Sequence, residues 1–140
     1  MNWFECKVSY EKMMENGLQK KVSEVYLVDA LSHAEAEAMV IEEMKSCING
    51  EFSILTVRKA NYMEVLTSER NDWWWRCRVS FIGLDEKFGA EKRINVLMLA
   101  AGDDIEDVIR RVKEAMRGSL SDYEIIGINK SNILDIILHN

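Results

Sequence analysis

Apolar and polar residues alternate along two stretches near the N-terminus, residues 3–10 and 22–29. A period of two places successive side chains on opposite faces of an extended chain, so both stretches are predicted to be half-buried β-strands. The segment Glu15-Asn16-Gly17 between them has the composition of a tight turn, which indicates a β-hairpin. A β-branched run over residues 52–61 predicts a further strand.

A helical period separates the hairpin from that last strand. Ser32 and Glu35 have the spacing of a capping box, and Asn49-Gly50 is typical of a helix end. Glutamates occupy the water side of this helix, and such an acidic face is either an ordinary solvated surface or a docking face for a basic partner. The apolar stripe consists of Ala36, Val40, Met44 and Cys47, and the acidic face of Glu35, Glu37, Glu42 and Glu43.

The second half of the chain repeats the first. Residues 3–10 align with residues 74–81 at a shift of 71, and four of the eight pairs are identical. The match continues at a shift of 72 through the second strand and the helix, and it returns to 71 where residues 52–61 meet residues 123–132. Repeats of about 70 residues are whole supersecondary units that have been duplicated, rather than turns of a solenoid.

The second copy has its own turn and cap signals. Lys87-Phe88-Gly89 is predicted to be the turn of its hairpin, and Gly102-Asp103-Asp104 to start its helix. Gly118 is placed to end that helix in a left-handed conformation. The apolar stripe of this helix is Ile105, Val108, Ile109, Val112, Ala115 and Met116.

These patterns predict an α+β fold of two ββαβ repeats with approximate two-fold symmetry, in which one helix covers each antiparallel sheet. We expect residues 1–140 to form a single compact domain, with the first repeat at 3–66, a polar linker at 67–72 and the second repeat at 73–138. Because one helix covers only part of such a sheet, the two repeats should pack together. Helices do not follow every strand, which argues against a doubly wound parallel sheet.

Composition and charge narrow the class of protein. A chain of 140 residues that is 48% hydrophobic and 30% charged is neither disordered nor collagen-like. It has no apolar run near the roughly 20 residues that cross a bilayer, and its first residues do not resemble a signal peptide, so we expect a cytoplasmic protein without a membrane partner. The net charge of -6 argues against bulk binding of a phosphate backbone and leaves room for a local basic patch.

No catalytic constellation is recognised, so we expect no enzyme activity, no cofactor and no metal site. Gly-rich phosphate loops and nucleophile-elbow motifs are absent, and the two histidines, His33 and His139, do not have the spacing of a ligand or a base. The three cysteines show no CxxC spacing. Cys6 and Cys77 occupy the same repeat position and are expected to be small buried hydrophobes, and Asp103-Asp104 to be capping residues.

The chain also resembles a known family. The likeness is carried by Trp3–Val8, Tyr10–Val22, Tyr26–Ser32, Leu84–Lys87 and Gly89–Lys92, and it extends over the full length. The family comprises small proteins of gut Bacteroides-type bacteria and their phages and is catalogued as a domain of unknown function. The resemblance implies a cytoplasmic protein of bacterial or phage origin, and it implies no activity, cofactor or catalytic residue.

Candidate binding residues lie on one face of the first strand of each copy. Trp3 and Lys7, and in the second copy Trp74, Arg76 and Arg78, alternate with the apolar residues of these strands. An aromatic ring followed at a spacing of two by cations suits a surface that stacks bases and pairs phosphates, and we expect this surface to be partly exposed. The alternative places both tryptophans in the contact between the copies or in an oligomer.

A second basic group, Lys20-Lys21 with Lys92-Arg93, lies at equivalent hairpin arms. It suits an anionic ligand or a nucleic-acid backbone, or else consists of edge-strand lysines that discourage aggregation. The sequence therefore favours a non-enzymatic binding module for nucleic acid, or for a protein of the nucleic-acid machinery. The alternatives are a small-ligand binder for a nucleotide-like molecule and a structural homo-oligomer such as a homodimer.

Overall fold

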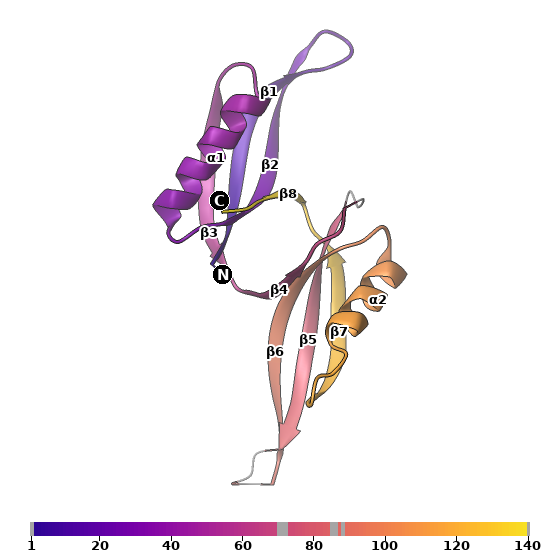
Figure 1. Ribbon diagram of the computed structural model, residues 1–140. Coiled ribbons are helices and arrows are strands. Elements are labelled where there is room, and N and C mark those ends of the chain that lie inside the picture. Colours follow the sequence, from indigo (N-terminus) through magenta and orange to yellow (C-terminus); the bar gives the residue numbers. More distant parts are fainter. Residues whose placement is uncertain (1, 70–72, 85–86, 88, 140) are drawn as a thin grey trace. The chain divides into compact units, whose positions relative to one another are not determined.

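The computed structural model describes residues 2–69, 73–84, 87 and 89–139. Within these residues the order of two strands, one helix and two strands occurs twice (Figure 1). The elements are β1 (Trp3–Met13), β2 (Gln19–Asp29), α1 (His33–Cys47), β3 (Phe52–Ala60), β4 (Tyr62–Leu66), β5 (Trp74–Leu84), β6 (Glu91–Ala101), α2 (Ile105–Ala115), β7 (Asp122–Lys130) and β8 (Ile133–Ile137).

The strands form two four-stranded sheets, and each sheet has one helix. The strand order is β3-β1-β2-β8 in the first sheet and β4-β6-β5-β7 in the second. The predicted α+β class with two similar halves is confirmed. Each sheet is mixed rather than purely antiparallel, because its fourth strand, β8 or β4, pairs in parallel with its neighbour and was not predicted from the sequence.

Each sheet takes this fourth strand from the other half of the chain. β4 follows β3 along the chain but pairs with β6, and β8 follows β7 but pairs with β2. The chain consequently forms two compact units that differ from the sequence repeats: the first unit contains β1, β2, α1, β3 and β8, and the second unit contains β4, β5, β6, α2 and β7. The expected single compact domain stays a prediction.

The connections explain why β4 and β8 leave their own half. Only Asn61 lies between β3 and β4, and only Ser131 and Asn132 lie between β7 and β8. A two-residue hairpin turn requires at least one residue with a positive φ, and none of these three residues has one. The chain therefore continues forward into the other sheet instead of turning back beside the strand it has just left.

The two halves match down to their irregularities. The pairing of β1 with β3 has a register shift between Lys7 and Val8, and the pairing of β5 with β7 has the equivalent shift between Arg78 and Val79. A β-bulge is a specific feature of a strand pair, so its recurrence at the same repeat position supports a duplicated unit.

The predicted helix caps are confirmed. The Ser32 hydroxyl accepts a hydrogen bond from the N–H of Glu35 at 3.1 Å, and the Asp104 carboxylate accepts one from the N–H of Asp107 at 2.8 Å. Gly118 follows the end of α2 with a φ of 88°, in the left-handed region that favours glycine. Local sequence signals therefore place both helices along the chain.

Two sequence predictions fall partly outside the described residues. They are the linker at 67–72, of which residues 70–72 are not described, and the hairpin turn at 87–89, of which Phe88 is not described. Gly89 has a φ of 66°, similar to the 82° of its counterpart Gly17. Both hairpins thus contain a glycine in a conformation that side-chain-bearing residues rarely adopt.

Each unit has an apolar core between its helix and its sheet. Cys6 and Cys77, at equivalent positions of β1 and β5, are fully buried as predicted. Cys47, the last residue of α1, is exposed, which differs from its assignment to the apolar stripe. The helix residues that are buried are Ala36, Val40 and Met44 of α1 and Val108 and Val112 of α2.

The burial of two thiols predicts selective cysteine chemistry. Burial raises the pKa of Cys6 and of Cys77 to about 11, so at pH 8 both are neutral thiols shielded from water. We expect N-ethylmaleimide to modify Cys47 at the rate of an exposed thiol and to modify Cys6 and Cys77 only in the unfolded chain. Peptide mass spectrometry after timed labelling measures each site. Modification of native Cys6 or Cys77 at the rate of a free peptide would show that the assignment of these side chains to the core is wrong.

Candidate functional site

Trp3 and Trp74 are buried rather than presented on a surface. Their neighbours Phe4 and Trp75 belong to the cores beneath the helices, so strand alternation places Trp3 and Trp74 on the opposite faces of the sheets, as predicted. Only 5% of Trp3 and 7% of Trp74 is exposed. Neither indole offers a free face to a base, and the expectation of a partly exposed stacking surface does not hold for these two residues.

The cations predicted beside the tryptophans have different surroundings. Lys7 and Arg78 are exposed, whereas Arg76 is half-buried and its Nε donates a hydrogen bond to the Tyr62 hydroxyl at 3.0 Å. The Arg78 guanidinium lies across Gly127, where a Cβ atom would come within 2.7 Å of Nη2. The two arginines of β5 thus contact other strands of their own sheet, Arg76 the strand β4, which lies beyond β6, and Arg78 the neighbouring strand β7.

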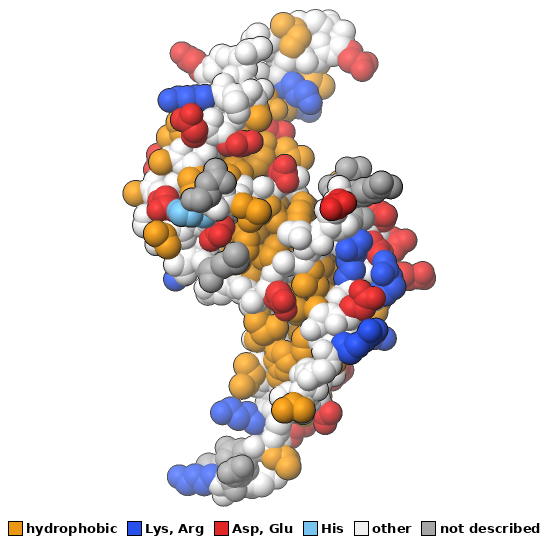
Figure 2. Space-filling model, in the orientation of Figure 1, with side chains coloured by type: hydrophobic (Ala, Val, Ile, Leu, Met, Phe, Trp, Pro, Cys, Tyr) orange, Lys and Arg blue, Asp and Glu red, His pale blue; other side chains and the backbone are white. Residues whose placement is uncertain are grey.

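The predicted basic hairpin residues are exposed, but they lie in different units. Lys20 and Lys21 are in the β1–β2 hairpin, and Lys92 and Arg93 are in the β5–β6 hairpin. Figure 2 shows basic side chains over each hairpin. Arg93 donates a hydrogen bond to Glu124 at 3.0 Å, which raises the pKa of the guanidinium and offsets its charge locally.

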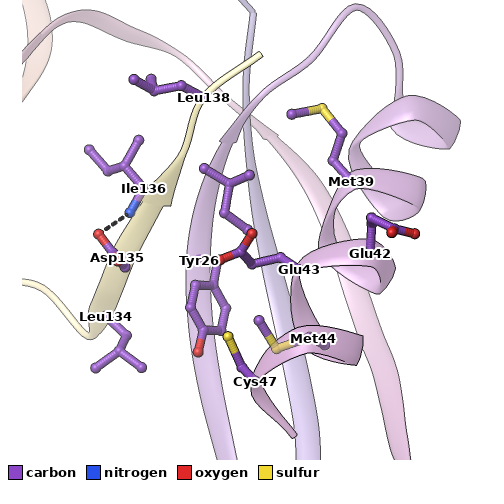
Figure 3. A pocket seen from close by; sticks show the side chains of 11 residues that line it. Tyr26, Met39, Glu42, Glu43, Met44, Cys47, Leu134, Asp135, Ile136 and Leu138 are labelled. Carbon is purple, nitrogen blue, oxygen red and sulfur yellow. Dashed lines mark hydrogen bonds between the residues drawn. The ribbon is translucent and has the colours of Figure 1, made fainter. Parts of the chain in front are cut away.

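A groove that the sequence did not predict lies in the first unit between α1 and β8 (Figure 3). Its volume is about 740 Å³. The Tyr26 side chain extends from β2 into the groove, with β8 on one side and α1 on the other. The groove is lined by Tyr26, Met39, Glu42, Glu43, Met44, Cys47 and residues 134–138.

The position of the helix on the sheet accounts for this groove. In the first unit α1 packs mainly on β3, β1 and β2, and part of β8 lines a groove beside it, although Ile137 of β8 packs against the core beneath the helix. In the second unit α2 packs on β6 and on β4, the strand equivalent to β8. A helix is about 10 Å wide, and four strands at a spacing of about 4.8 Å are nearly twice that width, so one helix cannot cover a whole sheet.

The groove has an apolar part, formed where the helix meets the sheet, beside its carboxylates. Met39 and Ile137 pack against the edge of the core, and Met44 is buried beneath them. The Tyr26 hydroxyl donates a hydrogen bond to Glu24 at 3.1 Å. Burial, followed by the charge of Glu24, raises the pKa of Tyr26, so the phenol is neutral at physiological pH.

Carboxylate side chains lie on both walls of the groove, which are formed by α1 and β8. Glu42 and Glu43 are exposed residues of α1, and Glu43 points toward Tyr26 (Figure 3). On the opposite wall Asp135 accepts a hydrogen bond from the N–H of Ile136 at 2.8 Å. The groove therefore combines an apolar floor with negative charge at its margins, a combination that suits a ligand or partner with apolar and basic groups.

In both units side-chain contacts link the residues after the fourth strand to the first turn of the helix, but the side chains differ. In the first unit His139 Nε2 lies 2.8 Å from a Glu35 oxygen. At the equivalent positions of the second unit, Ser68 accepts a hydrogen bond from Arg111 at 3.2 Å, and Arg111 in turn lies 3.5 Å from Asp107. Arg111 is the repeat counterpart of Met39. The helix position that is apolar in the first unit is therefore a cation in the second.

The remaining sequence candidates are structural. Asp104 caps α2, as predicted. The His33 ring packs edge-on against Phe4, with 4.8 Å between ring centroids. Among the described residues no three His, Cys, Asp or Glu side chains come together in a group that could hold a metal ion. None of the described helices has the length and apolarity needed to cross a membrane.

Sequence reasoning missed the groove because it missed β8. The apolar run Ile133–Ile137 falls at the same repeat position as 62–66, and this recurrence is the signal that could have indicated a fourth strand. The acidic face of α1 was identified, and two of its members, Glu42 and Glu43, line the groove.

Comparison with known proteins supports one part of the resemblance noted from the sequence, the domain of unknown function. The chain matches no curated protein and no solved structure. The model of one family, described as a domain of unknown function, matches residues 2–139, which is nearly the whole chain. The chain therefore belongs to the DUF4494 family.

Proposed function

We propose that the protein is a non-enzymatic binding module and that the groove between α1 and β8 is its contact site for a protein partner. The observation that supports this proposal is the groove of about 740 Å³ between α1 and β8, which is lined by both apolar side chains and carboxylates. Leu134 and Leu138 at the margin of the groove are 50% and 56% exposed, and clustered exposed apolar residues mark interaction surfaces.

The chemistry of the groove favours a protein over the other candidate partners. Carboxylates on both walls repel phosphate, and the net charge of -6 adds to that repulsion. The volume alone also suits a small ligand. The exposed leucines beside the groove extend the apolar surface beyond it, which fits a macromolecular contact better than an enclosed ligand.

A photo-crosslinker on Cys47 tests the proposal. Cys47 lines the groove and is the exposed cysteine, so a benzophenone maleimide can be attached to the natural thiol. In a lysate of the cells from which the gene comes, irradiation is expected to give a discrete adduct seen on a denaturing gel. Excess unlabelled protein should compete the adduct away, and an excess of the variant Met39→Arg, which copies Arg111 of the second unit, should not.

The second unit supplies the matched control. Ser119 is exposed and aligns with Cys47 in the sequence repeat, so the double variant Cys47→Ser, Ser119→Cys moves the crosslinker to the second unit, shortly after the end of α2. We expect no adduct from this control. Equal adducts from both positions, or none from Cys47, would contradict a contact site in the groove. Thermal melting of each variant establishes that it is folded.

Binding of nucleic acid through the hairpin arms is a second candidate. Lys20, Lys21 and Lys92 are exposed, and the apolar side chains Met13 and Leu18 near the end of the first hairpin are 62% and 67% exposed. Two-stranded ribbons of this kind enter the major groove of DNA, and exposed apolar side chains can insert between base steps.

Fluorescence anisotropy of a labelled oligonucleotide tests this candidate. If the arms bind, affinity falls steeply as the salt concentration rises. In the double variant Lys20→Ala, Lys21→Ala, the slope of log K against log salt concentration should become less negative by about 0.7 to 0.9 for each phosphate that is no longer neutralised. Lys45→Ala, at an exposed position of α1, is the control that should bind normally. No change in anisotropy at low salt and high micromolar protein would remove nucleic acid from the candidates.

We also propose a cytoplasmic location and a bacterial or phage origin. The origin rests on the family resemblance, and the location rests on that resemblance and on the sequence features described above. Immunoblotting of cell fractions tests the location.

A further inference from the structure

We infer that the partner element bound by the groove is an amphipathic helix with a basic flank, which lies beside α1 over β2 and β8. This inference rests on the proposed function and specifies the partner's chemistry. It follows from the geometry of the two units, the polarity of the groove and the distribution of charge on its walls.

The second unit shows that a helix fits over the exchanged strand. There α2 packs on β4 and β6, and the Arg111–Ser68 hydrogen bond joins the helix to the end of the strand. In the first unit α1 packs over β3, β1 and β2, and the equivalent strand β8 lines a groove beside the helix. The width of a four-stranded sheet leaves room for one further helix beside α1.

The groove has the surface that such a helix needs. A docked amphipathic helix places apolar side chains at intervals of three and four residues into a hydrophobic groove. Met39 is partly buried at the groove and offers a flexible, polarizable side chain that adapts to different apolar partners, and Met44 lies in the core beneath it. Ile137 and the ring of Tyr26 complete the apolar floor.

The carboxylates of the groove determine which charged residues can flank the apolar stripe of the partner helix. Glu42 and Glu43 on α1 and Asp135 on β8 would lie on either side of the docked helix. Lysine or arginine residues next to the apolar stripe of the partner would pair with these carboxylates, whereas an acidic helix would be repelled. The inferred partner is therefore a basic amphipathic helix.

A synthetic peptide provides the probe. It has leucines at helical spacing and lysines at the other positions, and its ends are acetylated and amidated. Its length is about 14 residues, at which an isolated helix is only marginally stable in water. The protein is labelled with ¹³C at the methionine methyl groups. Met39 and Met44 report on the groove, and Met98 and Met116 in the core of the second unit are internal controls.

We expect the peptide to shift the methyl signals of Met39 and Met44, to leave those of Met98 and Met116 unchanged, and to gain helical circular dichroism on binding. Replacement of the lysines by glutamates should weaken binding about tenfold or more, since several partly exposed attractive charge pairs become repulsive. A central proline, which breaks the helix, should abolish binding.

Variants of the protein complete the test. Glu43→Lys changes an exposed residue, so the fold is retained, and it should weaken binding of the lysine peptide about tenfold and strengthen binding of the glutamate peptide. Glu114→Lys, at an exposed position of α2, makes the same change of net charge in the second unit and should have no effect.

The outcomes separate this inference from the proposed function. Equal binding of the proline peptide would overturn a helical partner, and equal binding of the glutamate peptide would overturn a basic one. If the Cys47 adduct forms but no peptide shifts Met39 or Met44, the inference fails and the proposed function stands. If neither the adduct nor the shifts appear, both fail.

Discussion

The pairing of β8 with β2, and of β4 with β6, determines how the rest of the structure is arranged. Each of these short parallel strands completes the sheet of the other half of the chain, so neither half of the sequence forms its own unit. The groove depends on this exchange, because β8 supplies one of its walls. Residues from opposite halves of the sequence, such as Met44 and Ile136, line one cavity for this reason.

Duplication followed by divergence explains why the two units offer different surfaces. In both units the residue two positions after the fourth strand, His139 or Ser68, is linked to an acidic side chain in the first turn of the helix. Arg111 mediates this link in the second unit, and His139 contacts Glu35 directly in the first. The direct contact leaves the position of Met39 free to be apolar, which a bridging arginine would not allow.

The sequence predicted what local patterns encode. The repeat, the hairpins, the caps at Ser32 and Asp104 and the burial of Cys6 and Cys77 all follow from short-range spacing, and the structure agrees with each of them. The sequence did not predict β4 and β8, because a connection of one or two residues without a turn signal makes a new strand resemble the continuation of the last one. Alternation assigned Trp3 and Trp74 to the correct face, but it cannot show whether that face is covered. The groove required knowledge of both the exchanged strand and the position of α1, and neither is encoded locally.

Cross-strand nuclear Overhauser effects in the isotopically labelled protein test the exchange most directly. In the register of the structure Leu27 lies opposite Ile136 and Val65 lies opposite Leu99, with parallel pairing in both cases. The account predicts backbone contacts between these pairs. Contacts of residues 133–137 with β7, as in a hairpin, or no contacts with β2, would contradict the exchange and with it the groove.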